Sequence, residues 1–318
     1  MVTDDPAPNS AIQRLFAEGR LSLGLVLPIA VGPSGIVDWQ AQLGLARLAD
    51  RLGFAALWVR DVPLNSPDYP DPVGHSDPWT LLGALAAGTE RIALVTGAIV
   101  LPLRHPLHVA KGAVSVQSLS NGRFVLGLGS GDRREEFAAF GRDPAAHRSL
   151  FREGWERVAA ALGPDGAVIP DMPDGQGGAF ELKPAPRAHI PMLAVGSAGQ
   201  SLEWIARNAA GWATYHRGYE IQKDRIALWR AALAKTRPGA FRSLSQSMAL
   251  QLLDDPDAPL QDIDLGYQCG RNALVGALDG LRRLGVHHVM LNLPRAGRPP
   301  ESVLEELAGE VMPRIAGG

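Results

Sequence analysis

The residues from Val195 to Ala209, VGSAGQSLEWIARNA, have the pattern of a strand, a turn of small residues and the start of a helix. Backbone N–H groups at such a turn point toward one spot, where the helix dipole favours an anion. A serine that merely caps the helix gives the same pattern, so both interpretations stay open. The predicted phosphate-binding residues are Gly196, Ser197, Ala198, Gly199, Gln200 and Ser201.

One arginine could complete this site. Arg148 stands near the start of a predicted helix, and a guanidinium can bind a phosphate through two parallel hydrogen bonds. An arginine in this charged segment, HRSLFREGWER, could equally be a solvated surface residue.

A second stretch, Ile92–Asp132, has the pattern of two apolar strands joined by one helix, and both strands end at small residues. Its motif GLGSGD is not a dinucleotide fingerprint, because Asp132 stands where the third glycine is needed and a charged loop follows. We expect instead that Gly129, Ser130 and Gly131 let a flat ligand lie against the backbone. A strand end that requires a positive φ would look the same.

Polar side chains follow other predicted strands at their carboxyl ends, which form the catalytic face of an α/β barrel. Asp61 and His216 are the candidate catalytic residues, because both are titratable. The alternatives are an Asp–Arg pair that holds the loop and a histidine with a structural role. The polar residues expected to line the ligand pocket are Arg60, Tyr215, Arg217 and Asn292.

The remaining pattern predicts the elements that position these residues. Strands are expected at Leu21–Leu27, Ala55–Val59, Ile92–Val100, Arg123–Leu128, Met192–Val195, Trp212–Tyr215, Ser243–Leu253 and His288–Leu293. Helices are expected after Ser10 and at Asp38–Leu52, Pro78–Gly88, Pro106–Ser120, Ala145–Leu162, Gln200–Asn208, Glu220–Lys235, Asn272–Leu284 and Pro300–Ile315. This alternation favours an α/β fold of the (β/α)₈ TIM-barrel type, and a doubly wound open sheet is the alternative.

We expect residues 1–318 to form a single domain. Residues 1–9 are expected to be a loose tail, and residues 163–188 a hairpin insertion around Ala167–Ile169 and Ala179–Leu182. Two polar connections, Pro63–Pro78 and Asp254–Gln268, exceed the usual loop length, which makes them candidate lids over the site.

The composition describes an ordinary globular protein, with 46% apolar and 20% charged residues among 318. A net charge of −2 gives no basic field for nucleic acid or for an anionic membrane. The single cysteine, Cys269, excludes an intrachain disulfide, and no apolar run resembles a signal peptide or a membrane span. We therefore expect a cytoplasmic location. No histidine spacing predicts a metal site, and no GxSxG motif predicts a serine hydrolase.

Together these segments resemble the bacterial-luciferase-like family of flavin-dependent oxidoreductases over essentially the whole chain. The most specific part is TGAIVLPLRHPLHVAKGAVSVQSLSNGRFVLGLGSGD, and GFAALWVRDVPL, VGSAGQSLEWIARNAAGWATY and GRNAL also match. The resemblance implies a TIM barrel and reduced FMN, or in some members a deazaflavin, as cofactor. It places a non-prolyl cis peptide, Gly97–Ala98, beneath the flavin ring. The ring edge would be lined by Gly129, Ser130 and Asp132, and the phosphate held by Arg148, Ser197 and Ser201.

Three positions depart from the luciferase pattern. Val62 stands where luciferase has its catalytic histidine, and Gly129 replaces the cysteine beside the reactive flavin carbon. Ser130 replaces a phosphate-binding arginine. The resemblance therefore implies flavin binding without light emission or oxidation of a long-chain aldehyde.

The first functional expectation is a monooxygenase that uses reduced FMN and O₂ on a small organic substrate. A separate NAD(P)H:flavin reductase is an expected partner. A deazaflavin-dependent hydride-transfer enzyme and a non-catalytic flavin-binding protein are the alternatives. A homodimer is also expected, because the helix Pro78–Gly88 is apolar nearly all round, although burial within the barrel would give the same pattern.

Overall fold

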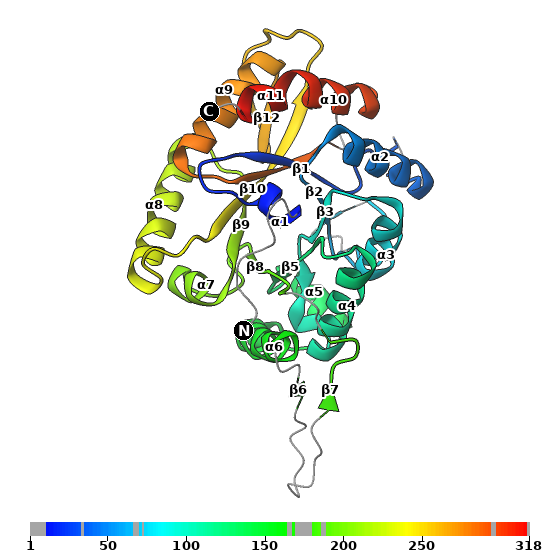
Figure 1. Cartoon of the computed structure of the whole chain (residues 1–318), viewed down its shortest axis with the longest axis vertical. Coiled ribbons are helices and arrows are strands. Elements are labelled where there is room, and N and C mark those ends of the chain that lie inside the picture. Colours follow the sequence, from blue (N-terminus) through cyan, green and yellow to red (C-terminus); the bar gives the residue numbers. More distant parts are fainter. Residues whose placement is uncertain are drawn as a thin grey trace, which may run out of the picture.

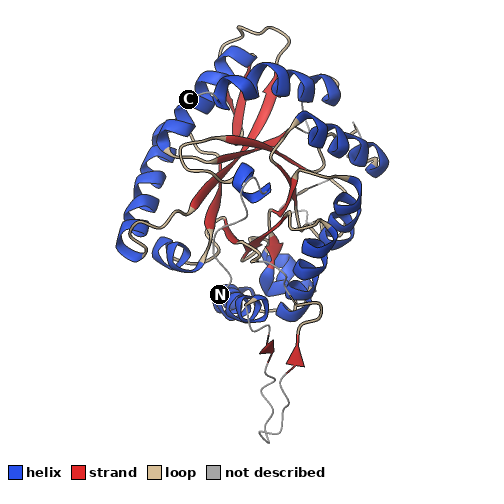
Figure 2. Cartoon of the chain, viewed as in Figure 1, coloured by secondary structure: helices blue, strands red, loops and turns tan. Residues whose placement is uncertain are grey.

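Parallel strands in the described part of the chain close into a barrel (Figures 1 and 2). The computed structural model describes residues 11–32, 35–65, 70–71, 73–163, 167–168, 180–185, 189–293 and 297–316. The ring closes where β13 pairs with both β10 and β1. The barrel strands are β1 (Ser22–Val26), β2 (Ala56–Val59), β3 (Ala93–Thr96) with its continuation β4 (Ile99–Val100), β5 (Phe124–Gly129), β8 (Met192–Val195), β9 (Gly211–Tyr215), β10 (Ser243–Leu252) and β13 (His288–Asn292). The closed ring confirms the (β/α)₈ prediction and excludes the open sheet.

Helices form a ring outside these strands (Figure 1). They are α2 (Trp39–Leu52), α3 (Pro78–Gly88), α4 (Pro106–Leu119), α5 (Arg134–Ala139), α6 (His147–Leu162), α7 (Leu202–Asn208), α8 (Tyr219–Thr236), α9 (Arg271–Leu284), and α10 (Pro300–Glu306), which continues through a π-helical turn, Leu307–Val311, into α11 (Met312–Ala316). Local sequence sets their ends: Asp38 caps the N–H groups of Gln40 and Ala41, and Gly53 closes α2 at a φ of 88°.

The apolar residues pack in two layers. The larger lies between strands and helices, and the smaller fills the barrel with residues such as Val95, Val125 and Trp58. The short helix α1 (Ala11–Leu15) covers the amino end of the strands, where Leu15 is buried and its carbonyl accepts a hydrogen bond of 2.8 Å from Ser22 Oγ. The helix α1 therefore occupies the amino end of the barrel, where Ala11 and Leu15 join the inner core.

Two segments expected to be loops contain regular structure. The charged segment after Gly131 forms α5. The connection Asp254–Gln268 contains β11 (Gln261–Ile263) and most of β12 (Gly266–Cys269). The reason is the length of β10, which continues beyond its barrel neighbours and offers Ala249–Leu252 as an edge for β12. The helix α4 buries Val109, Ala110, Ala113 and Val114, whereas Leu119 at its end is 62% exposed.

The predicted insertion is a hairpin in its described part, where β6 (Ala167–Val168) pairs antiparallel with β7 (Phe180–Glu181). It projects from the barrel beside α6 (Figure 1). The predicted tail, residues 1–9, lies outside the described residues. Within the described ranges, no helix combines the length and the apolar character that crossing a membrane requires.

Candidate active site at the carboxyl end of the barrel

The first part of the site is a bulge between β3 and β4. Val95 pairs with Val125 and Ile99 with Leu128, so three residues on one strand face two on the other. The Thr96 side chain bridges this gap, because its Oγ1 donates to the Gly127 carbonyl at 2.8 Å and accepts from the Gly127 N–H at 2.7 Å. The peptide Gly97–Ala98 within the bulge is cis, as predicted.

Small residues let the backbone segments at this bulge pack closely. A Cβ built on Gly129 would lie 3.2 Å from the Ala98 Cβ, and a Cβ on Gly127 would lie 1.9 Å from the Thr96 carbonyl oxygen. Gly131 has a φ of +77° and its missing side chain makes room for Phe137 and Val100. Larger side chains therefore do not fit at the ends of β3 and β5, where Gly97 and Ala98 are partly exposed and Gly129 is buried. Ser130 is buried beside it and Asp132 is exposed.

The second part is the turn of residues 196–201, which the β5–β8 pairing places next to the bulge, with Leu128 opposite Ala194. Gly196, Ala198 and Gly199 all have positive φ values, so the chain winds tightly before α7. Within the described residues, no group accepts a hydrogen bond from the backbone N–H of Ser197, Ala198 or Ser201. These donors are available to an anion.

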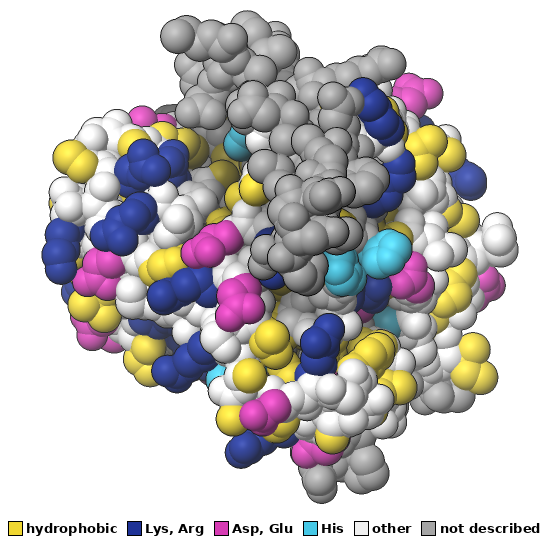
Figure 3. Space-filling view, turned by 90° about the horizontal axis from the view of Figure 1, so that it is seen from below, with side chains coloured by type: hydrophobic (Ala, Val, Ile, Leu, Met, Phe, Trp, Pro, Cys, Tyr) yellow, Lys and Arg dark blue, Asp and Glu magenta, His cyan; other side chains and the backbone are white. Residues whose placement is uncertain are grey.

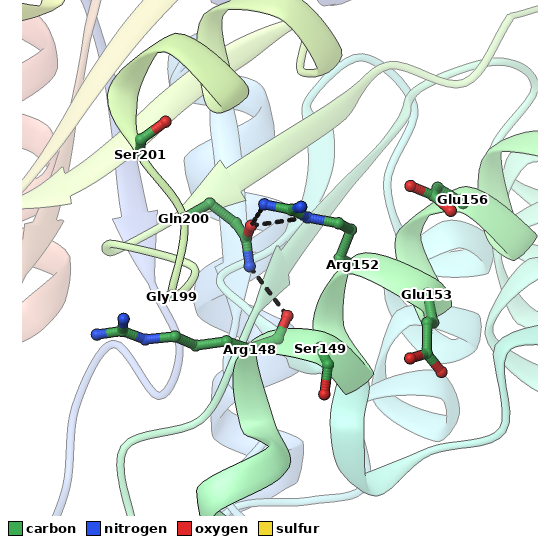
Figure 4. A pocket seen from close by; sticks show the side chains of 8 residues that line it. All are labelled: Arg148, Ser149, Arg152, Glu153, Glu156, Gly199, Gln200 and Ser201. Atoms are coloured by element: carbon green, nitrogen blue, oxygen red, sulfur yellow. Dashed lines mark hydrogen bonds between the residues drawn. The ribbon is translucent and has the colours of Figure 1, made fainter.

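Arg148 lies against this turn, as the phosphate prediction requires. A Cβ on Gly199 would be 2.9 Å from Arg148 Cγ, so the two segments are in contact. In Figure 4 the Arg148 side chain extends away from Gln200, whereas Arg152 turns toward it. No described carboxylate pairs with the Arg148 guanidinium. The residues around this contact line an open depression of about 430 Å³, and Glu153 and Glu156 of α6 line it as well.

Gln200 fastens the turn to α6. Its Oε1 accepts from Arg152 Nη2 at 2.8 Å, and its Nε2 donates to the Arg148 carbonyl at 3.0 Å. Ser201 caps α7 by accepting from the Trp204 N–H at 3.2 Å. The cap uses a lone pair of the serine oxygen, and the serine hydroxyl also interacts with the carboxylate of Glu203.

The carboxylate of Asp61 has two hydrogen-bonding partners, Arg104 and the backbone of Val100. Its carboxylate accepts two hydrogen bonds of 2.7 Å from Arg104 and one of 3.1 Å from the Val100 N–H. Its side chain is only 3% exposed. This arrangement ties the end of β2 to the end of the bulge, and a positioning role explains every contact that it makes.

A buried charge cluster, which sequence reasoning missed, lies beside Asp61. Asp71 accepts from Arg60 at 2.8 Å and from Arg133 at 3.2 Å, and His75 lies 3.6 Å away. The pKa of Asp71 is held well below its usual range, chiefly by His75 and then by Arg60. Burial raises the pKa of the neighbouring Glu136. The cluster joins the Pro63–Pro78 connection to β2 and α5, and the dense acidic and basic residues of DRREE were its signal in the sequence.

His216 faces away from the barrel mouth. Its Nδ1 lies 2.9 Å from Gln246 Nε2, and its ring meets Tyr267 edge-on at 4.7 Å. Gln246 lies two residues from both Leu244 and Met248 on β10, so the three side chains are on the same side of the strand. Because Leu244 and Met248 belong to the layer between strands and helices, Gln246 and its partner His216 face that layer. Burial lowers the pKa of His216.

The other predicted pocket residues follow the strand ends as expected. Tyr215 is exposed as the last residue of β9, and Arg217 is exposed just after the strand. Asn292 is half-buried at the end of β13, opposite Ala249. The structure thus brings together the bulge, the 196–201 turn and Arg148, and it leaves His216 outside that group. Within the described ranges, no three side chains of histidine, cysteine, aspartate or glutamate gather as metal ligands would.

Comparison with known proteins agrees with this architecture. The model of the luciferase-like monooxygenase family matches residues 18–263. An uncharacterised protein of Mycobacterium tuberculosis is 32% identical over 242 residues, which cover 70% of this chain and 82% of that protein.

Two solved structures share the fold. One is the FMN complex of the oxygenating constituent of 3,6-diketocamphane monooxygenase from Pseudomonas putida, with a TM-score of 0.71, 16% identity and coverage of 94% of this chain and 99% of that one. The other is an F420-dependent secondary alcohol dehydrogenase with an F420–acetone adduct, with a TM-score of 0.74, 15% identity and coverage of 93% and 99%. From the family match, this chain belongs to the luciferase-like monooxygenase family and is an oxidoreductase.

Proposed function

We propose that this chain binds FMN at the carboxyl end of its barrel and acts as a monooxygenase on a small organic substrate. One observation carries the proposal: a bulge of small residues, Thr96–Ala98, lies one strand away from a turn whose Ser197, Ala198 and Ser201 N–H groups have no partner among the described residues. The same holds for the nearby Arg148 guanidinium. FMN has the matching parts, a flat ring system and one phosphate. When bound, reduced flavin would supply the electrons that activate O₂.

The residues present fit such a ligand. Gly97, Ala98 and Gly129 would contact the ring without a side chain in the way. Ser197, Ala198 and Ser201 offer N–H donors, and Arg148 offers a charge that could hold the phosphate. Gly131 and Asp132 would line the ring edge beside Ser130, as the resemblance implies.

The remaining residues would position and enclose the cofactor. Asp61 holds the end of the bulge through Val100, and we assign it a positioning role. His216 supports the layer behind β9 and β10. The Asp71 cluster anchors the connection over β2, where exclusion of water would favour oxygenation. Tyr215, Arg217 and Asn292 would face the substrate, together with Arg60, whose guanidinium is also ion-paired with Asp71.

A deazaflavin-dependent hydride transfer is the second candidate. It is supported by the fold shared with the F420-dependent alcohol dehydrogenase, and the 196–201 turn would suit its phosphate equally. Membership of a family of oxidoreductases argues against the non-catalytic alternative.

The deciding experiment compares the two cofactors on the purified protein. Titrations with FMN, anaerobically reduced FMN and F420, followed by fluorescence, should give a saturable binding curve for FMN in at least one redox state. Oxygen consumption with an NAD(P)H:flavin reductase and a substrate panel then tests oxygenation. Tight binding of F420 alone would establish the second candidate, and binding of neither cofactor would refute both.

A further inference from the structure

Trp58, on β2, fills the space directly under the bulge. It is 1% exposed and belongs to the core inside the barrel. A Cβ built on Gly97 would lie 2.7 Å from its Cε3 atom, so the backbone of the bulge rests on the indole ring with no side chain between. The Gly97 N–H is fixed from the side by the Val59 carbonyl at 2.7 Å.

A chain of hydrogen bonds holds this indole in place. Trp58 Nε1 donates to His288 Nε2 at 2.9 Å. Because an indole nitrogen can only donate, His288 must be neutral, with its proton on Nδ1. That proton is shared with Ser22 Oγ at 2.7 Å, and the serine hydroxyl donates to the Leu15 carbonyl at 2.8 Å. All donors run in one direction, from the bulge to α1.

Packing fixes the same groups from the sides. The Trp58 and His288 rings are stacked, with centroids 5.7 Å apart and planes at 21°. Phe16 meets the imidazole edge-on at 6.3 Å. Gly24 makes the arrangement possible, since a Cβ there would lie 2.6 Å from His288 Nε2. The column Trp58–His288–Ser22–Leu15 is therefore held by hydrogen bonds and ring contacts along its length, and it ties β2, β13, β1 and α1 together.

We infer that Trp58 is a positioning residue for the cofactor ring: the column sets the height and tilt of the bulge on which the ring would lie. The inference rests on the proposed function. The bulge lacks regular ladder hydrogen bonds, so its position depends on what supports it from below. A phenylalanine at position 58 would fill most of the space but would lose the N–H that fixes the ring orientation.

Two variants test this inference. Trp58→Phe removes the hydrogen bond beneath the bulge, and Ser22→Ala removes an acceptor at the far end without touching the bulge. Trp229→Phe is the matched control, because Trp229 is a buried tryptophan that pairs with Trp212 in the outer layer. The measurements are the thermal midpoint, the cofactor dissociation constant, and the visible circular dichroism of the bound cofactor.

Trp58→Phe should weaken cofactor binding by about threefold to tenfold, the effect of one lost buried hydrogen bond, and should change the visible dichroism. Ser22→Ala should shift the dichroism in the same direction by a smaller amount. Trp229→Phe should lower the thermal midpoint without either change. A purely structural column predicts lower midpoints in all three variants with unchanged affinity and dichroism, and that result would overturn the inference.

Failure of the proposed function is distinguishable from failure of the inference. If the wild-type protein binds neither FMN nor F420, the function is refuted and the positioning role falls with it. If the wild type binds a cofactor and Trp58→Phe binds it with the same affinity and dichroism, only the inference is refuted.

Discussion

At the scale of single residues, Asp61 illustrates how a titratable group at a strand end can serve the backbone. Its carboxylate accepts from Arg104 and from the Val100 N–H, so it fixes the loop after the bulge. Arg104 also lies 3.5 Å from Asp77. The sequence left catalytic and structural roles open, because it does not show which arginine meets which aspartate.

Removing either member of the Asp61–Arg104 pair distinguishes a structural role of Asp61 from a catalytic one. Asp61→Asn and Arg104→Met should each lower the free energy of unfolding by about 1–3 kcal/mol, a value reduced for the partial exposure of Arg104. Turnover per folded molecule should fall to a similar extent in both variants, as measured by urea unfolding and steady-state assay. Loss of turnover in Asp61→Asn alone, at unchanged stability, would instead identify Asp61 as a catalytic acid or base.

Arg148 is the second residue whose role can be isolated. Arg148→Ala should weaken FMN binding by about 10–100-fold, because charge-assisted hydrogen bonds contribute about 1.5–3 kcal/mol. Arg148→Lys should recover only part of the loss if the contact is bidentate. Arg157→Ala, an exposed arginine on the same helix, is the control and should bind FMN like the wild type. Equal affinity in Arg148→Ala and Arg157→Ala would exclude a phosphate role for Arg148.

At the scale of elements, the site depends on irregularities in strands that are otherwise ordinary. The bulge between β3 and β4 turns the backbone toward the mouth of the barrel, and Thr96 replaces the missing ladder bonds. The length of β10 lets β12 extend the sheet beyond the barrel. Both features arise from strand length and pairing, which apolar patterns do not specify to one residue.

The geometry of the bulge requires a glycine at position 127. Gly127→Ala should lower the free energy of unfolding by at least about 2 kcal/mol, since the new Cβ would lie 1.9 Å from the Thr96 carbonyl oxygen. Gly83→Ala is the matched control in α3, where no atom lies within 4 Å of the added Cβ. That control should be neutral or stabilising by up to about 1 kcal/mol, because alanine favours helices. Similar thermal midpoints for the two variants would contradict the bulge geometry.

At the scale of the whole molecule, barrel closure buries the groups that join the first strand to the last. Burial lowers the pKa of His288 to about 3 and that of His287 to about 4. The free thiol of Cys269 is also buried, which raises its pKa to about 11. The surface is different: acidic and basic side chains are interspersed on the face in Figure 3, in keeping with the net charge of −2.

These histidines predict the pH dependence of stability. Both have folded-state pKa values below the unfolded value of about 6.5, so the unfolded chain binds more protons between pH 6.5 and about 4. Stability should therefore fall as pH falls through this window, by up to about 1.4 kcal/mol per pH unit for each histidine. Urea unfolding at several pH values measures the slope. His287→Gln should reduce the slope, and a flat profile above pH 5 would disprove the assignment.

The expected homodimer stays a prediction. The apolar pattern of α3 that motivated it has an intrachain explanation, because Leu81, Leu82, Leu85 and Ala86 are buried in the core of this chain. Light scattering on the purified protein would determine the oligomeric state.

The sequence by itself determined the architecture and the candidate anion site. Apolar runs and caps placed α3 and β8 at their observed bounds, since propensity, capping and burial act locally. The turn of residues 196–201 was also local, and its glycines imposed the backbone shape. The resemblance to a known family identified the cis peptide.

Only the tertiary structure decided which distant groups meet. Barrel closure joins Trp58 to His288 across 230 residues, and folding joins Arg133 to Asp71 across 62. It also decided that His216 faces the helices, because the side of a strand on which a residue lies depends on register. Long-range contacts follow from ring closure and side-chain packing, and neither leaves a periodic signal in the chain.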